Sequence, residues 1–195
     1  EDQRQNGMIG SALLDARTGQ MLWSTPAEKD TGRGVAADID PRHWGAEFWN
    51  SSSAELFDVA GKPIGPRPRQ MNFAIWWDGD LLRESLDHVA IDKWNPAAFK
   101  FENLLNGKAF GAASNNGTKG NPVLSADLFG DWREEIIWRT TNNDALRIYT
   151  TTTLATNRFY TLMHDPQYRC AVAWQNTGYN QPPHPGFYLG EGMNK

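Results

Sequence analysis

The stretch Ala126-Asp127-Leu128-Phe129-Gly130-Asp131-Trp132-Arg133-Glu134-Glu135-Ile136 passes from apolar residues through an Asp-containing turn to Glu and back to apolar residues. Two earlier stretches, 37–48 and 77–84, follow the same plan, and the first Asp of the three turns falls at Asp38, Asp78 and Asp127. Units of about 40 to 50 residues are typical of a β-propeller or a similar array of small sheets. The repeat therefore predicts strand pairs whose turns present clustered carboxylates.

Short β-rich segments separated by turn residues fill the rest of the chain. Residues 8–25 predict a hairpin, and apolar runs at 34–38, 45–49, 54–59, 62–64, 73–77, 86–94, 136–140, 146–150 and 170–174 predict further strands. Residues 95–108 predict a short helix or an irregular crossover, and 114–122 a long exposed loop. No window shows a sustained helical stripe. With roughly four strands per repeat, we predict an all-β fold, a partial β-propeller of about three to four blades.

The composition limits the partners of this chain. A net charge of -4 and a pI near 5.6 argue against nucleic acid as a partner, because a phosphate backbone requires a basic face. No apolar run approaches the roughly 20 residues that span a bilayer, so we expect no membrane partner. Residues 1–20 lack the pattern of a signal peptide. The single cysteine, Cys170, excludes an internal disulfide. The nine tryptophans indicate either core packing or sugar stacking.

The repeat units do not close a ring by themselves. The chain enters a hairpin almost at its first residue, which predicts a fragment of a longer protein. Three to four blades would leave strand edges and apolar faces exposed, which is an aggregation hazard. We therefore expect either missing blades elsewhere or association between copies of the chain.

The acidic turns are candidate calcium sites, since calcium takes six to eight oxygen ligands, several of which one tight turn can supply. The alternative is that these side chains only hydrogen-bond the local backbone, as turn aspartates commonly do. A metal bound there would be structural more than catalytic, because the turns belong to the repeat. The candidate ligands are Asp38, Asp40 and Glu47, then Asp78, Asp80 and Glu84, then Asp127, Asp131 and Glu134 with its neighbour Glu135.

Three polar segments lie outside the repeat. Residues 115–119 combine amide, hydroxyl and ammonium groups, and 179–184 present a phenol, two amides and an imidazole beside two prolines. Arg33 adds a guanidinium between two glycines. These groups suit an anionic, hydroxyl-rich ligand, although an ordinary polar loop has the same composition. The isolated histidines His43, His88 and His164 are interpreted as packing or surface residues.

Four blocks of sequence, 72–84, 126–140, 160–169 and 179–184, resemble the rhamnogalacturonan lyases of polysaccharide lyase family 11, in order and over nearly the whole chain. The resemblance implies a secreted, extracellular bacterial enzyme of pectin degradation with an eight-bladed propeller and bound calcium. Residues 1–195 would be the C-terminal part of its catalytic domain. The implied activity is calcium-assisted β-elimination at the α-1,4 bond between rhamnose and galacturonate of rhamnogalacturonan I.

The resemblance also implies the site residues. Lys119 and Tyr179 would be catalytic, with Lys119 as base or holder of the uronate carboxylate, and Tyr179 as base, proton donor or hydrogen-bonding partner. The implied substrate-binding residues are Asn116, Gly117, Thr118, Arg33, His184 and Glu1. Two alternatives stay open: a non-catalytic carbohydrate-binding or calcium-stabilised propeller module, and a structural fragment that associates with other copies.

Overall fold

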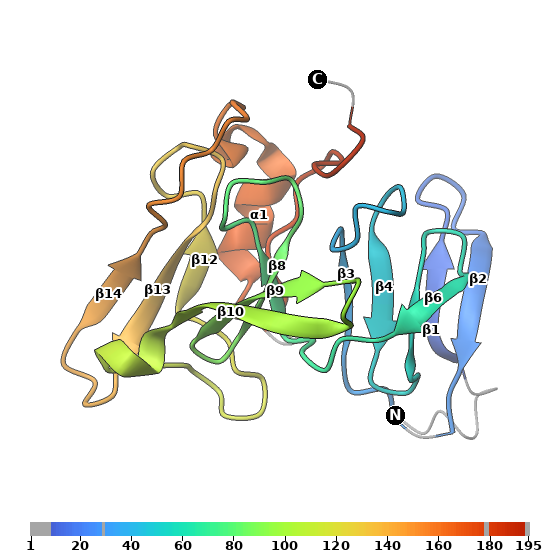
Figure 1. The fold of residues 1–195 in the computed structure, drawn as a ribbon, viewed down its shortest axis with the longest axis horizontal. Helices are drawn as coiled ribbons and strands as arrows, with labels where there is room; N and C mark the ends of the chain where they lie inside the picture. The colour runs from blue at the N-terminus through green and yellow to red at the C-terminus, as the bar shows by residue number, and fades with distance from the viewer. Residues whose placement is uncertain (1–8, 29, 178–179, 194–195) are drawn as a thin grey trace.

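The computed structural model describes residues 9–28, 30–177 and 180–193, and Glu1 and Tyr179 lie outside the described residues. Its body is three antiparallel four-stranded sheets arranged side by side, with a separate hairpin at one end (Figure 1). The hairpin is β1 (Ile9–Leu14) and β2 (Met21–Pro26). In the first sheet the order is β3 (Gly34–Ala37), β4 (Glu47–Asn50), β5 (Glu55–Phe57) and β6 (Pro63–Pro66).

The other two sheets repeat this plan with one variation. The second sheet runs β7 (Phe73–Ile75), β8 (Glu84–Asp87), β9 (Ala90–Asn95) and β10 (Lys100–Asn106) in sequence order. In the third sheet β13 (Glu135–Thr140) pairs with β11 (Ala112–Ala113), β12 (Leu124–Ala126) and β14 (Leu146–Tyr149). Two 3-10 helices, η1 (Gly107–Phe110) and η2 (Leu162–His164), and one α-helix, α1 (Pro166–Trp174), complete the described elements.

Strand register makes the three sheets equivalent at the acidic turns. Glu47, Glu84 and Glu135 each begin the strand that follows the turn, and each pairs with the last residue of the strand before the turn. The residue that follows that last position is Asp38 in the first sheet, Trp76 in the second and Asp127 in the third. Asp78 therefore lies two positions beyond the place of Asp38, so the spacing of first aspartates is not the structural period.

Apolar side chains fill the spaces between successive sheets. One cluster joins the first and second sheets through Trp49, Leu56, Ala74 and Trp94. A second joins the second and third sheets and contains Ile75, Leu86, Ile136 and Trp138. Six of the nine tryptophans are buried, which confirms packing as the main role of these residues.

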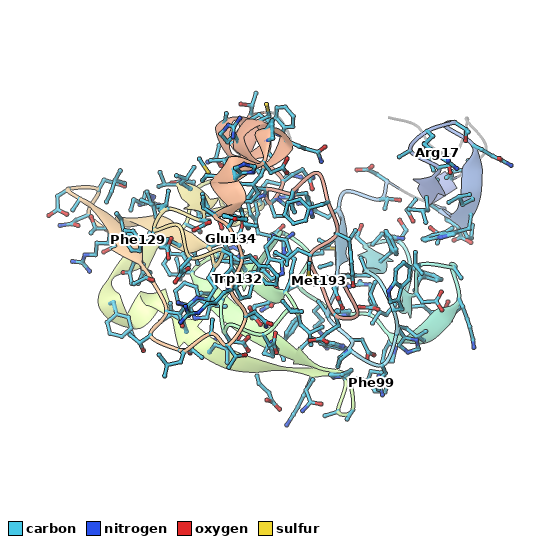
Figure 2. All side chains as sticks on the ribbon, turned by 90° about the horizontal axis from the view of Figure 1, so that it is seen from above. Arg17, Phe99, Phe129, Trp132, Glu134 and Met193 are labelled. Carbon is cyan, nitrogen blue, oxygen red and sulfur yellow. The ribbon has the colours of Figure 1, made fainter. Side chains whose placement is uncertain are left out.

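A third apolar cluster lies under the C-terminal segment. Trp132, Tyr168 and Leu189 bring the third acidic turn, α1 and the tail together. Seen from above, Trp132 and Glu134 lie toward the interior, whereas Arg17 and Phe99 lie at the periphery (Figure 2).

Two predicted elements are wrong. The sequence predicts a strand at residues 170–174, but they form the C-terminal part of α1, which has Asp165 as its N-cap and Pro166 in the first turn. Residues 95–108 contain neither a helix over most of their length nor an irregular crossover, because Lys100–Asn106 is the edge strand β10. The fold is otherwise the all-β architecture that the sequence predicts. Among the described residues, no helix has the length and apolar character needed to cross a membrane.

Candidate functional site

The sheets have two chemically different ends. Each acidic turn follows β3, β7 or β12, whereas Arg33, Asn72 and the loop 114–121 precede these strands. Turns at one end are joined by backbone bonds, from Arg83 N to Asp38 O at 2.7 Å and from Glu134 N to Trp76 O at 2.9 Å. We call this the acidic end and the opposite one the loop end; Figure 1 shows the loop before β12 at the lower edge.

A chain of hydrogen bonds crosses the loop end from sheet to sheet. Arg33 donates through Nη1 to Asn180 O at 2.6 Å and through Nε to Asn72 Oδ1 at 3.2 Å. Asn72 Nδ2 donates to Asp87 Oδ1 at 2.6 Å, and this oxygen also lies 2.8 Å from His88 Nδ1. His88 Nε2 lies 3.0 Å from Gly117 O. The C-terminal segment, Arg33 and the loop 114–121 are therefore parts of one connected surface.

The loop 114–121 is closed at its base by its own bonds. Asn115 and Asn121 form an isolated antiparallel bridge, and Asn116 O accepts from Lys119 N at 2.9 Å and Gly120 N at 2.8 Å. Asn121 Nδ2 donates to Asn176 Oδ1, which also accepts from Asn180 Nδ2 at 3.1 Å. This arrangement leaves the side chains at the tip of the loop facing solvent.

The structure groups most of the expected substrate-binding residues. Asn116, Gly117 and Thr118 are exposed, and Lys119 is half-buried, all on the one loop. Arg33 is linked to this loop through the chain of hydrogen bonds. Tyr179, expected as a catalytic residue, and Glu1, expected as a substrate-binding residue, lie outside the described residues.

His184 takes a different position from the loop residues. Arg83 Nη1 lies 3.1 Å from His184 Nδ1, and Arg83 cannot accept a hydrogen bond, so Nδ1 accepts and the imidazole carries its proton on Nε2. Loss of solvent around the ring and the Arg83 charge lower the pKa of His184 to about 3. A neutral His184 can therefore donate from Nε2 but stands apart from the hydrogen-bonded surface of the loop end.

The Glu of each acidic turn is used to close the turn. Ile39 N and Asp40 N donate to Glu47 Oε2 at 2.9 and 3.0 Å. In the same way Trp77 N donates to Glu84 Oε2 at 2.8 Å, and Leu128 N to Glu135 Oε2 at 2.8 Å. In the third sheet this role belongs to Glu135 and not to Glu134. In each turn, one carboxylate oxygen of this Glu therefore accepts hydrogen bonds from the local backbone.

In the first acidic turn, two carboxylate oxygens accept no hydrogen bond from the described residues. Among the described residues, Asp38 Oδ1 and Glu47 Oε1 are buried without a hydrogen-bond partner. Burial, with the nearby charges of Asp38 and Asp40, raises the pKa of Glu47 to about 8. Burial likewise raises the pKa of Asp38 to about 6. Asp40 is neutralised by Arg42, whose Nη2 lies 2.6 Å from Asp40 Oδ2. Two buried, uncompensated oxygens are what a bound cation would satisfy.

The second acidic turn contains a cluster that could hold a metal ion, formed by Asp78, Asp80 and Glu84. The Lys93 ammonium already lies among these carboxylates, 2.8, 2.7 and 2.6 Å from them respectively. These carboxylates raise the pKa of Lys93 despite its burial, and burial raises that of Glu84. An internal cation therefore supplies at this turn the charge that a metal would bring.

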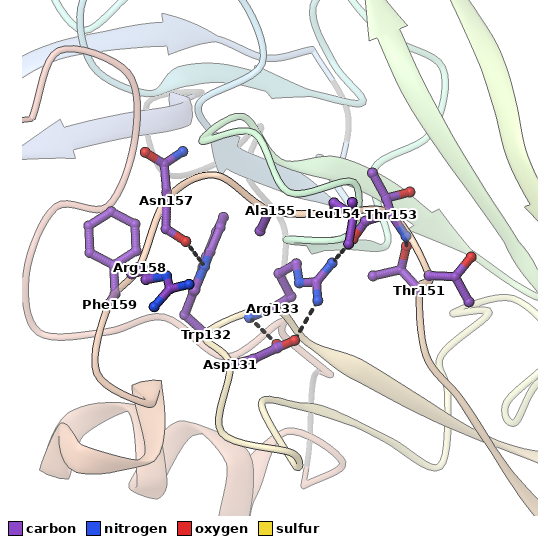
Figure 3. A pocket seen from close by; sticks show the side chains of 11 residues that line it. Asp131, Trp132, Arg133, Thr151, Thr153, Leu154, Ala155, Asn157, Arg158 and Phe159 are labelled. Atoms are coloured by element: carbon purple, nitrogen blue, oxygen red, sulfur yellow. Dashed lines mark hydrogen bonds and ion pairs between the residues drawn. The ribbon is translucent and has the colours of Figure 1, made fainter.

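In the third acidic turn the carboxylates are satisfied within the chain. Asp127 accepts from Gly130 N, Thr161 Oγ1 and Leu162 N, at 2.8, 2.7 and 2.8 Å. Asp131 pairs with Arg133 at the edge of a surface depression of about 420 Å³, which Trp132, Leu154 and Phe159 also line (Figure 3). This depression lies at the acidic end, away from Lys119. The third turn therefore leaves few carboxylate oxygens for a calcium ion.

Glu134 belongs to a buried ionic network between the second and third sheets. Arg83 Nη2 lies 3.4 Å from Glu134 Oε2, and Tyr168 Oη donates to Glu134 Oε1 at 2.7 Å. Arg83 also donates to Ala74 O at 2.7 Å and stacks on Trp76, with Cζ 4.1 Å from the ring centroid. Burial raises the pKa of Glu134, and the Arg83 charge and the Tyr168 hydrogen bond counteract it. Glu134 therefore stabilises the contact between sheets and is not available as a metal ligand.

The two ends are too far apart to act on one small group. The strands between them contain four, three and three residues, which at about 3.3 Å per residue separate the ends by roughly 10–13 Å. A metal in an acidic turn would consequently stabilise the turn and would not touch a sugar bound beside Lys119.

Comparisons of this chain with known proteins give one consistent result. Residues 1–195 match the family model described as rhamnogalacturonan lyase family 11, C-terminal domain. The chain is 56% identical over 190 residues to rhamnogalacturonan endolyase YesW of Bacillus subtilis (strain 168), covering 97% of this chain and 30% of that protein. It is 52% identical over 202 residues to rhamnogalacturonan exolyase YesX of the same organism, covering 95% and 33%.

The similarity extends to three dimensions. The crystal structure of rhamnogalacturonan lyase YesW superposes with a TM-score of 0.90 at 55% sequence identity, covering 94% of this chain and 31% of that one. The chain thus spans about a third of the length of the curated relatives it matches. On the match of all its residues, the chain belongs to the family of C-terminal domains of rhamnogalacturonan lyase family 11.

Proposed function

We propose that this chain supplies one wall of the active site of a rhamnogalacturonan lyase that cleaves rhamnogalacturonan I. The observation that supports this most directly is the hydrogen-bonded surface at the loop end, where Arg33, Asn180 and the loop that carries Lys119 meet. Both named relatives are lyases of rhamnogalacturonan, one endo and one exo, and the proposal concerns the chemistry that both names share.

The reaction requires a proton to leave a weakly acidic carbon. In β-elimination at galacturonate, a base removes the C5 proton, the C4–O bond to the neighbouring sugar breaks, a C4–C5 double bond forms, and the departing oxygen takes up a proton. Cationic groups beside the uronate carboxylate stabilise the charge that develops as the proton leaves. Lys119 and Arg33 are cationic residues of the loop end, and Asn116 and Thr118 offer hydrogen bonds to sugar hydroxyls. Tyr179 remains the second proposed catalytic residue.

We further propose that calcium binds the first acidic turn, held by Asp38 and Glu47 and by Asp40, which must release Arg42 to reach the ion. The two buried oxygens without partners support this choice. Calcium bound there supplies positive charge that ionises Glu47 and fixes the turn. The second turn is the next candidate, although a metal there must displace Lys93. The proposal also includes the propeller arrangement and secretion to the extracellular substrate. Further blades would be contributed by the rest of the protein or by another copy.

An absorbance assay tests the activity. The protein that carries this chain is mixed with rhamnogalacturonan I with and without calcium, and the ultraviolet band of unsaturated uronates is followed. We expect the band to grow with time and with enzyme concentration. Binding of the polysaccharide without growth of the band would instead establish the non-catalytic binding module.

Glu47→Gln tests the first turn as a metal site. Without metal, the folded chain retains a proton on Glu47 that the unfolded chain releases, so the free energy of unfolding falls as pH rises from 4.5 to about 8. The substituted amide can accept the same backbone bonds without a charge. In chelator at pH 8 we expect the variant to be more stable than the native protein by about 1 kcal/mol. Calcium should stabilise the native protein and not the variant, as measured by thermal unfolding.

Glu84→Gln is the matched control, because Glu84 has the equivalent place in the second turn but its Oε1 is bonded to Lys93 at 2.6 Å. Burial raises the pKa of Glu84 to about 8 as well, but the Lys93 charge opposes this rise, so we expect the variant to be destabilised in chelator, where it loses the ion pair. Equal calcium stabilisation of native protein and Glu47→Gln would remove the first turn from the metal proposal.

A further inference from the structure

His88 contacts the Lys119 loop at two points. It lies in the tight turn between β8 and β9 with φ of 55°, a conformation uncommon for residues other than glycine. Its backbone N donates to Gly120 O at 2.8 Å, and its ring Nε2 lies 3.0 Å from Gly117 O. A Cβ on Gly120 would lie 2.7 Å from His88 Nδ1, so the loop packs directly on the ring. Gly117 is thereby tied to the second sheet.

Both ring nitrogens of His88 face groups that accept hydrogen bonds. Asp87 Oδ1 lies 2.8 Å from Nδ1, and the Gly117 carbonyl oxygen can only accept. A neutral imidazole has a single N–H, whereas the imidazolium has two. The ring is thus held between the Asp87 carboxylate on one side and the Gly117 carbonyl on the other. The Asp87 carboxylate is itself oriented by Asn72, which Arg33 holds in turn.

We propose that His88 is a positioning residue, whose backbone and imidazole ring hold the loop of Asn116–Lys119 in the conformation that receives the substrate. The loop tip is exposed and its residue Asn116 has a φ of 47°, so its shape depends on anchoring contacts. His88 connects Gly117 through Asp87 and Asn72 to Arg33, another cationic residue of the loop end. The inference rests on the proposed function for its kinetic part and on the structure alone for the ordering of the loop.

Loss of the anchor should appear in substrate binding more than in turnover. If the loop spends a smaller fraction of time in the competent conformation, the apparent dissociation constant rises by the inverse of that fraction. Once substrate is bound, the loop is ordered by the substrate itself. We therefore expect KM to rise about tenfold on loss of the anchor, with kcat within about threefold of the native value.

Two substitutions separate the anchor from the turn conformation. His88→Asn keeps a residue that tolerates positive φ and a donor near the place of Nδ1, but its side chain is too short to reach Gly117. His88→Gln places its amide nitrogen near the position of Nε2, so it can still donate to Gly117 O. His164→Asn is the control, since His164 lies in η2, outside the loop end.

The experiment measures steady-state kinetics and amide hydrogen exchange of residues 116–120 in the protein that carries this chain. We expect His88→Asn to raise KM about tenfold and speed exchange in the loop, and His88→Gln to recover most of both effects. His164→Asn should match the native protein. Native-like exchange in the loop of His88→Asn, or a fall in kcat and thermal stability with KM unchanged, would overturn the proposal. If the native protein lacks lyase activity, the proposed function fails while the exchange measurement still decides the role of His88.

Discussion

Replacing Arg83 with alanine should lower the free energy of unfolding by about 3–5 kcal/mol, because it leaves a buried carboxylate without its countercharge. Arg83 is 3% exposed and Glu134 is 1% exposed. The substitution also removes the donor to Ala74 O and the cation over the Trp76 ring. A loss of this size is a large share of the roughly 5–15 kcal/mol that stabilises a typical domain. Urea unfolding followed by tryptophan fluorescence measures it.

The neutral pair Arg83→Met with Glu134→Gln distinguishes a charge effect from lost packing. Truncating one partner leaves the other charged and buried, whereas neutralising both removes the electrostatic penalty. We expect the double variant to be less destabilised than Arg83→Ala, and a double-mutant cycle gives the coupling energy. If single and double variants lose equal stability, packing around Arg83 dominates and the ionic network is incidental.

The pH dependence of Arg83→Ala provides an independent check. Burial already raises the pKa of Glu134, and the Arg83 charge opposes that rise. Without Arg83 the folded-state pKa rises further above the unfolded value. Stability tied to the protonated carboxyl is present at low pH and lost as pH rises, so the variant should be closer to the native protein in mild acid than at about pH 8. A constant difference across this range would contradict the assignment.

The repeat was readable in the sequence because each unit uses the same local chemistry. An apolar strand, a polar turn and a Glu that accepts backbone donors recur at Glu47, Glu84 and Glu135. Which of the adjacent Glu134 and Glu135 has this role was not readable. Neighbouring side chains at a strand's start point to opposite sides, and only the packing of the third sheet on the second decides which one meets Arg83.

Two misread segments illustrate how local signals compete. The run Cys170–Trp174 is short and apolar, and periodicity alone does not separate a short strand from a buried helix turn. The signal that identifies a helix here is Asp165-Pro166, an N-cap residue followed by a proline in the first turn. The Asp165 side chain accepts hydrogen bonds from Gln167 N and Tyr168 N. Strand β10 was missed because it is a partly exposed edge strand, with apolar and polar residues that do not alternate.

The candidate site is only partly predictable from the sequence, because some of its contacts join segments that are far apart in the chain. The loop of Asn116–Lys119 is evident as a polar segment outside the repeat, and Arg33 lies between glycines. The sequence alone indicates a surface or packing role for His88, since no ligand pattern surrounds it. Its contacts with Asp87 on one side and Gly117 on the other depend on the pairing of β8 with β9 and on the path of a loop from another sheet.

Lys119→Ala should lower turnover well over tenfold, about 10²-fold if the ammonium or amine acts at the reacting centre. Lys119 is half-buried on the loop that His88 anchors, and with Arg33 it contributes positive charge to the loop end. The absorbance assay measures the loss in the protein that carries this chain. Lys100→Ala is the control, since Lys100 is an exposed residue of β10. Near-native turnover of Lys119→Ala would remove this residue from the site.

Lys119→Arg separates the two roles that Lys119 can have. Arginine keeps the positive charge and can hold a uronate carboxylate, but it does not release its proton in proteins and so cannot act as a base. If Lys119 holds the carboxylate, we expect Lys119→Arg to retain most of the turnover that Lys119→Ala loses. If Lys119 is the base, both variants should lose turnover to a similar extent while KM changes little. In that case the charge that stabilises the developing anion must come from Arg33 or from a cation held by another part of the protein, since the acidic turns lie at the far ends of the strands.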